Sequence, residues 1–161
     1  FLFVFLNAVI NNPDCDLNFI MRPDLVLKLN ENVNVLKYLP KTKKPLVSTD
    51  YDPQATLQSY PGTGDRIFIF NKMGIISLKN FLLNFCNIEE FKGNKNKAIF
   101  KIWIKLVILL KNQNLLCGHS WPQFLFDSAG IIIRPMFNLE ILLPRVQVSR
   151  QLLKNFLTKT V

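Results

Sequence analysis

The pattern of apolar and polar positions predicts β-structure in the first half of the chain. Leu25–Leu29 and Val33–Leu36 partly alternate around Asn30-Glu31-Asn32, which predicts a β-hairpin because asparagine tolerates the left-handed turn conformation. Arg66–Phe70 (RIFIF) also has the composition of a strand. The apolar segment Phe1–Ile10 predicts a buried first strand or helix, since it is shorter than the roughly 20 residues that span a bilayer.

Helical spacing appears in the middle of the chain. After a predicted turn at Asn71–Gly74, the segment Ile75–Phe85 places apolar side chains three and four residues apart. The segment Ala98–Lys111 is the most hydrophobic of the protein, and Lys97, Lys101 and Lys105 recur beside it at i, i+4 and i+8. We therefore predict a pair of central helices, the second of them buried on most sides and carrying one basic stripe.

The C-terminal part again has a strand-like pattern. Three apolar segments are interrupted by prolines, as is typical of sheet edges and bulges: Gly130–Ile133, Met136–Leu143 and Arg145–Val148. A short terminal helix is predicted over Gln151–Leu157. The fold class expected from all these elements is α+β, with an N-terminal β-hairpin region, a central helical pair and C-terminal antiparallel strands.

One long polar stretch separates the two halves. Pro40–Gly64 contains four prolines and two glycines, which predicts an extended loop or linker. The expected organisation is an N-terminal apolar and hairpin region over 1–39, this loop over 40–64, and a basic α+β core over 65–161. At 161 residues the chain has the length of one domain, with an apolar fraction of 49% that excludes a disordered protein.

The net charge of +9 lies entirely in the second half. Residues 1–70 carry seven bases and seven acids, whereas residues 71–161 carry thirteen bases and four acids. Such a field favours polyanions, either nucleic acid or an anionic membrane surface, although a merely soluble basic surface would have the same composition. The abundance of Asn, Phe and Lys indicates an A/T-rich genome, such as that of an organelle, and this mutational pressure could itself have supplied some of the lysines.

The candidate RNA-binding residues form three groups of lysines and arginines. The main group runs from a polar loop into the second helix, with Phe91, Phe100 and Trp103 interleaved: Lys92, Lys95, Lys97, Lys101 and Lys105. A smaller group lies in the long loop and a third on the C-terminal strands: Lys41, Lys43 and Lys44, then Arg134, Arg145 and Arg150. Trp103 could stack on an unpaired base, although a core position is the commoner role at this spacing.

Motifs for catalysis or metal binding are incomplete. Cys117-Gly118-His119-Ser120-Trp121 is partly similar to the nucleophile region of papain-like proteases, but its only histidine is two residues from the cysteine. Pro61–Asp65 (PGTGD) lacks the Lys and Ser/Thr of a phosphate-binding loop. The carboxylate pairs Asp14/Asp16 and Asp50/Asp52 are predicted to form turns. With one histidine and three widely spaced cysteines, no catalytic residue, metal site or cofactor is predicted.

These observations predict a non-enzymatic, RNA-binding structural subunit of a large ribonucleoprotein. The particle expected is an organellar, mitochondrial ribosome, with rRNA and neighbouring proteins as partners. The alternative is a peripheral or interfacial structural subunit of an organellar membrane complex, supported by Phe1–Ile10 and the apolar helix. About ten further apolar residues before Phe1 would complete a membrane span and favour that alternative.

Overall fold

The computed structural model describes residues 1–12, 15–22, 26–27, 42–51, 63–88, 94–116, 120–136 and 141–142. Four helices and six strands lie in these ranges. The helices are α1 (Leu2–Asn11), α2 (Lys72–Cys86), α3 (Lys95–Asn112) and α4 (Ser120–Ser128). The strands are β1 (Leu17–Met21), β2 (Val26–Leu27), β3 (Leu46–Tyr51), β4 (Thr63–Asn71), β5 (Ile132–Met136) and β6 (Ile141–Leu142). The predicted α+β class is confirmed.

A four-stranded mixed sheet is the base of the fold, with strand order β1-β4-β3-β5. Strand β4 pairs antiparallel with both of its neighbours, β1 and β3. Strand β5 pairs parallel with β3 from Leu46↔Ile132 to Asp50↔Met136. The chain reaches this parallel position because α2, α3 and α4 supply the long crossover that parallel strands need.

The C-terminal strands differ in one respect from the antiparallel arrangement expected for them. Strand β5 joins the central sheet in parallel, and only β6 is antiparallel, paired with β2 through Val26↔Leu142 and Leu27↔Ile141. Pro135 lies inside β5, where an edge strand tolerates its missing N–H. The rest of the predicted hairpin, and the segments predicted over 145–148 and 151–157, lie outside the described residues.

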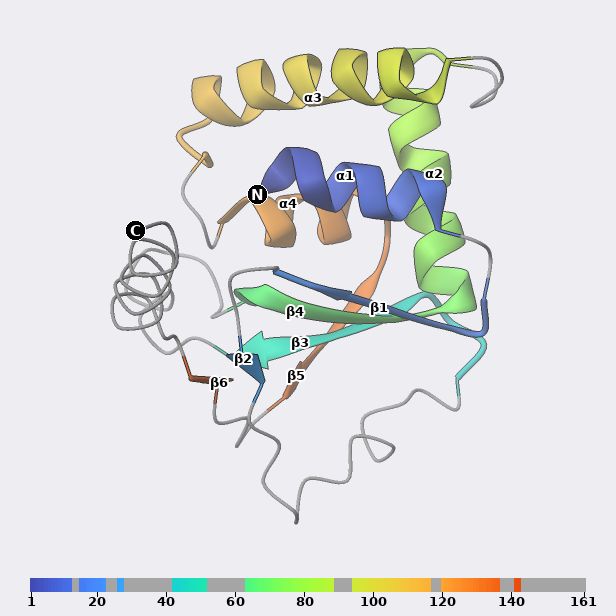
Figure 1. Ribbon diagram of the computed structural model, residues 1–161, viewed down its shortest axis with the longest axis vertical. Helices are drawn as coiled ribbons and strands as arrows, with labels where there is room; N and C mark the ends of the chain where they lie inside the picture. The colour runs from blue at the N-terminus through green and yellow to red at the C-terminus, as the bar shows by residue number, and fades with distance from the viewer. Residues whose placement is uncertain are drawn as a thin grey trace, which may run out of the picture.

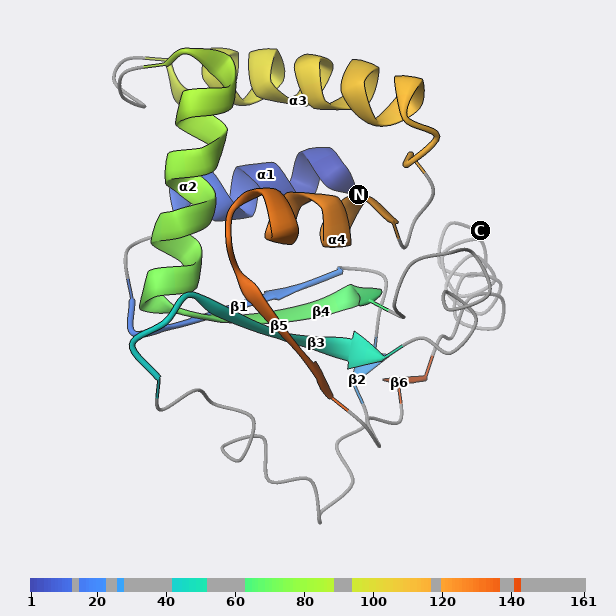
Figure 2. The same cartoon turned by 180° about the vertical axis from the view of Figure 1, so that it is seen from behind.

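The helices cover one face of the sheet in two tiers (Figure 1). Helices α1 and α4 lie directly over the strands, and α3 lies across the top of α1, farthest from the sheet. Helix α2 runs from the sheet up to α3 and joins the two tiers, as the view from behind also shows (Figure 2). One face of α1 is therefore part of the core, with Phe5, Leu6 and Val9 fully buried, whereas Phe3 and Val4 are exposed.

Aromatic rings fill the space between α1, α4 and β4. The ring of Phe5 makes edge contacts with those of Phe68 and Trp121, both with centroids 5.1 Å away. Phe126 of α4 contacts Phe68 and Phe70 of β4 at 5.5 and 5.6 Å. These side chains are all within 4% of complete burial, so Trp121 is a core residue.

The boundary between β4 and α2 is a single residue, Asn71, and the turn predicted at Asn71–Gly74 is wrong. The Asn71 side chain caps α2 by accepting from the N–H of Gly74 at 2.7 Å, and it also accepts from the N–H of Leu46 at 3.0 Å. Its amide nitrogen donates to the carbonyls of Thr42 and Lys44 at 3.2 and 2.8 Å. One buried side chain thus joins α2, β3 and the turn before β3.

Replacing Asn71 with alanine is expected to destabilise the protein by about 3 kcal/mol. Loss of an N-cap costs about 1 kcal/mol, and each buried partner left without a hydrogen bond adds a desolvation penalty of about 1–3 kcal/mol. Urea unfolding of the variant measures this change. The matched control is Asn80→Ala on the exposed side of α2, which should change the free energy of unfolding by less than about 0.5 kcal/mol.

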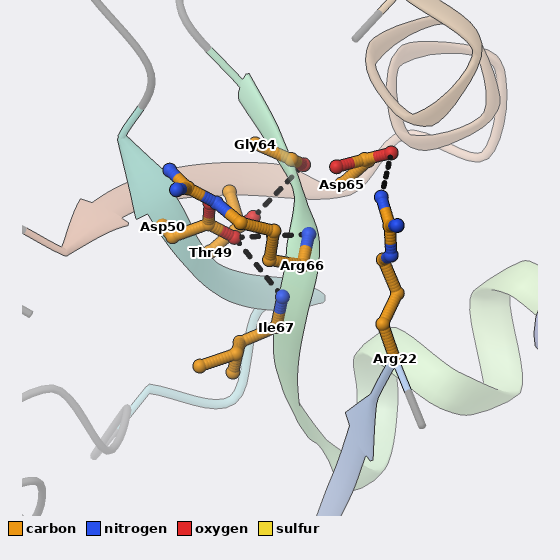
Figure 3. Close-up of polar contacts among 7 residues, drawn as sticks. All are labelled: Arg22, Thr49, Asp50, Gly64, Asp65, Arg66 and Ile67. Atoms are coloured by element: carbon orange, nitrogen blue, oxygen red, sulfur yellow. Dashed lines mark hydrogen bonds and ion pairs between the residues drawn. The ribbon is translucent and has the colours of Figure 1, made fainter. Parts of the chain in front are cut away.

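Strand β3 lies inside the segment 40–64 that was predicted to be a loop, and that prediction is wrong for Leu46–Tyr51. The strand is buried although half of it is polar, with Ser48, Thr49 and Asp50 at most 1% exposed. Thr49 donates its hydroxyl to the carbonyl of Gly64 at 3.3 Å, and Asp50 is bonded to β4 (Figure 3). The polar residues that led to the prediction of a loop therefore have hydrogen-bond partners on β4.

Candidate nucleic-acid interface

Helix α3 carries the main group of candidate lysines, and its inner face explains how it is held. Asn94 caps the helix by accepting from the N–H of Lys97 at 3.1 Å. The buried side chains of α3 recur at helical spacing and belong to the main hydrophobic core: Ile99, Ile102, Leu106 and Leu110. These residues pack toward α1 and α2 and leave the opposite face of α3 in solvent.

The prediction that this helix is buried on most sides is wrong. Phe100, Ile104 and Ile108 are 52%, 38% and 55% exposed, on the face opposite to the core. Because α3 lies on top of α1 and not against the sheet, only one side of it meets other elements of the described structure (Figure 1). An apolar segment therefore gave a helix with an apolar outer face as well as an apolar inner one.

Of the lysines of α3, Lys97, Lys101 and Lys111 lie on that same outer side, and Lys95 is the exposed first residue of the helix, on the same side as Ile99. Lys95, Lys97, Lys101 and Lys111 are exposed, and α3 contains no acidic residue. Lys95 and Lys97 lie in the first turn, where the positive end of the helix dipole disfavours a cation by about 0.3–1 kcal/mol. The two lysines of the first turn therefore do not contribute to the stability of the helix through its dipole.

Lys105 differs from the other lysines of the row because it is half-buried. Its ammonium group donates to the carbonyl of Cys86, at the end of α2, at 3.4 Å. Burial raises the pKa of the Cys86 thiol, and the positive charges of Lys105 and Lys101 oppose that shift. Lys105 thus joins α3 to α2, and the thiol of Cys86 is buried. Cys15 is exposed, and Cys117 is outside the described residues.

The remaining candidate bases do not converge on α3. Lys43 and Lys44 are exposed in the turn before β3, beside the N-terminus of α2, whereas α3 contacts the C-terminal end of α2. Fifteen residues of helix, about 22 Å, separate the two places. Arg134 lies on β5 opposite Ser48, next in sequence to core-facing Ile133, so its side chain lies on the sheet face away from the helices. Lys41, Lys92, Arg145 and Arg150 lie outside the described residues.

Two ion pairs lie at the Gly64 end of β4, one between Arg66 and Asp50 and the other between Arg22 and Asp65 (Figure 3). The Asp50 carboxylate accepts from Nε of Arg66 at 2.6 Å and from the N–H groups of Arg66 and Ile67 at 3.2 and 3.0 Å. It lies where the β3–β4 register shifts, so a side chain replaces ladder bonds there. Arg22 pairs with Asp65 at 3.0 Å. The turn predicted for Asp50 is therefore wrong, and Asp52 is outside the described residues.

The described ranges contain neither a cluster of candidate metal ligands nor a helix able to cross a membrane. No group of three or more His, Cys, Asp or Glu side chains there could hold a metal ion. No helix among the described residues has both the length and the apolar composition needed to cross a membrane. Cys117, Gly118 and His119 of the protease-like pentad are not described, while Ser120 and Trp121 begin α4 in the core.

Comparison with known proteins adds no relative to this description. No protein-family model matches the sequence, and no curated protein and no solved structure matches it. The class established for the chain is thus an α+β protein with helices on one face of a mixed sheet.

Proposed function

We propose that this protein is a non-enzymatic structural subunit of a large ribonucleoprotein, a mitochondrial ribosome, and that it binds rRNA through the outer face of α3. Lysine side chains would neutralise RNA phosphates, and apolar surface would pack on neighbouring proteins of the particle. This mechanism requires no cofactor. The lysines of the proposed contact are Lys97 and Lys101 on that face, with Lys95 at the exposed N-terminal end of the helix and Lys105 at its half-buried edge.

The observation that carries the proposal is the one-signed charge of α3. Its outer face presents Lys97 and Lys101, Lys95 is exposed at its N-terminal end, and the helix holds no acid that could neutralise them internally. The lysines of the first turn oppose the helix dipole, so helix stability does not account for them. Attraction to a polyanion does account for them, because each Lys–phosphate contact releases counterions from the nucleic acid.

Composition supports the same assignment at the level of the whole chain. The net charge of +9 is placed on the second half of the sequence, and the A/T-driven residue usage fits an organellar genome. The size of 161 residues suits a single-domain subunit that lies among other components.

The test is sedimentation of the tagged full-length protein from gently lysed source cells, with and without RNase. The expected result is a heavy particle that shifts to light fractions after RNase treatment. A heavy particle that ignores RNase would contradict the proposal. If that particle were released only by detergent, the protein would belong to a membrane complex instead.

A further inference from the structure

The outer face of α3 carries two parallel rows of different chemistry. Phe100, Ile104 and Ile108 follow one another at four-residue spacing and are 52%, 38% and 55% exposed. Lys97, Lys101 and Lys105 have the same spacing three residues earlier, so the two rows lie side by side, about 60° apart around the helix. A contact with phosphates alone uses the lysine row and leaves the apolar row unexplained.

Aromatic rings extend this apolar row onto a second helix. The Phe100 ring lies 5.7 Å from that of Trp103, tilted by 33°. Trp103 in turn meets the edge of Phe3 in α1, at 5.9 Å and 87°. Phe3 and its neighbour Val4 are 39% and 50% exposed. Three contiguous rings therefore extend from Phe100 beside the lysine row to Phe3 on α1, and Phe100 is more exposed than Phe3.

The presence of the two rows side by side on one face of α3 favours one kind of partner. A helix that lies in a membrane interface separates its apolar face from its charged face, because the apolar face dips about 5–10 Å into the lipid. On α3 the lysines share the outward side with Ile104 and Ile108, so they would be carried into the lipid with them. A duplex nucleic acid presents phosphates and hides its bases in the stack. Unpaired RNA offers both phosphates and free base faces.

We propose that the outer face of α3 binds single-stranded RNA, with a base stacked on Phe100 and phosphates held by Lys97 and Lys101. This inference rests on the proposed function and names the form of the RNA. Stacking on an exposed ring tolerates any base, and the flexible lysines follow the backbone without reading sequence. The site is therefore a platform for an unpaired segment of rRNA, with no base-specific recognition.

The experiment measures binding of the full-length protein to a fluorescent, unstructured 12-nucleotide RNA and to the blunt duplex of the same sequence, each length being about that of one such site. Phe100→Ala is expected to weaken single-strand binding by about tenfold and to leave the weaker duplex binding unchanged. Phe100→Tyr keeps a ring and should restore the affinity. The matched control is Phe19→Ala on β1, since Phe19 is 51% exposed and lies on the sheet face away from the helices.

Tryptophan fluorescence is a second measurement. It would show no response to RNA if Phe100 had only a structural role. Of the two tryptophans, Trp103 contacts the exposed Phe100 ring and Trp121 is 4% exposed in the core. Single-stranded RNA should quench the emission of Trp103, and a Trp103→Phe variant should lose that response. Thermal melting of each variant shows whether it is folded.

The outcomes separate this inference from the proposed function. Equal binding of single strand and duplex, with Phe100→Ala neutral, would overturn the stacking site while RNA binding survives. No binding of either RNA by the wild-type protein would overturn both proposals. Binding to vesicles with anionic lipids in place of RNA, lost in Phe100→Ala, would make this face a membrane contact and would likewise overturn them.

Discussion

Replacing Gly64 with alanine should destabilise the fold by about 3 kcal/mol or more. A Cβ atom at this position would overlap the carboxylate of Asp50. That carboxylate is 1% exposed and holds the N–H groups of Arg66 and Ile67 and the Arg66 guanidinium. To make room, Asp50 has to leave these partners, and a buried charge that loses its partners costs about 3–5 kcal/mol.

A double-mutant cycle tests this explanation directly. Asp50→Ala removes the obstructing carboxylate, so Gly64→Ala added to it should cost only about 1 kcal/mol or less, even though Asp50→Ala is itself destabilising. The control is Gly130→Ala, where φ is +65° but no atom lies within 4 Å of the new Cβ; about 1–2 kcal/mol of backbone strain is expected there. If Gly64→Ala costs the same in both backgrounds, the clash with Asp50 is not the cause.

Charge reversal on α3 should have the largest effect on RNA binding. The triple variant Lys95→Glu, Lys97→Glu and Lys101→Glu is expected to weaken RNA binding about 100-fold or more at about 0.1 M salt, because three attractive charges become repulsive. Lys105 is left in place, since a glutamate there would face the Cys86 carbonyl that Lys105 now bonds. Fluorescence anisotropy with labelled RNA measures the change.

The fold of this variant should be intact. All three lysines are exposed, and glutamates in the first turn of α3 interact favourably with the helix dipole, so the melting temperature should not fall. The matched control reverses three exposed lysines at the other end of α2, Lys43, Lys44 and Lys72. It changes the net charge equally but should weaken binding less than about tenfold, through long-range attraction alone. Equal losses in the two variants would mean that overall charge, and not α3, binds the RNA.

The sequence predicted the elements whose apolar periodicity is strong. Helices α2 and α3 and strand β4 were expected close to their observed positions, and so was the α+β class. Strand β3 was missed because Ser48, Thr49 and Asp50 look like loop residues until β4 supplies their partners. The parallel pairing of β5 was missed because it depends on where three helices return the chain.

The candidate site was predicted only in part. The spacing of Lys97, Lys101 and Lys105 correctly placed the lysines on one side of a helix, but it could not show which apolar face of that helix meets the core. Both faces are apolar, and only the packing of α3 over α1 leaves Phe100, Ile104 and Ile108 in solvent. The distance of Lys43, Lys44 and Arg134 from this face is likewise set by the fold.

The central claim, that α3 holds RNA phosphates, is tested most directly by the salt dependence of RNA affinity. For a single strand, the logarithm of the association constant falls with the logarithm of salt concentration by about 0.7 per neutralised phosphate. We expect the slope of the wild-type protein to exceed that of the Lys95/Lys97/Lys101 charge-reversal variant by about 2 in magnitude, for the three lysines removed. An identical slope in the two proteins would contradict the claim.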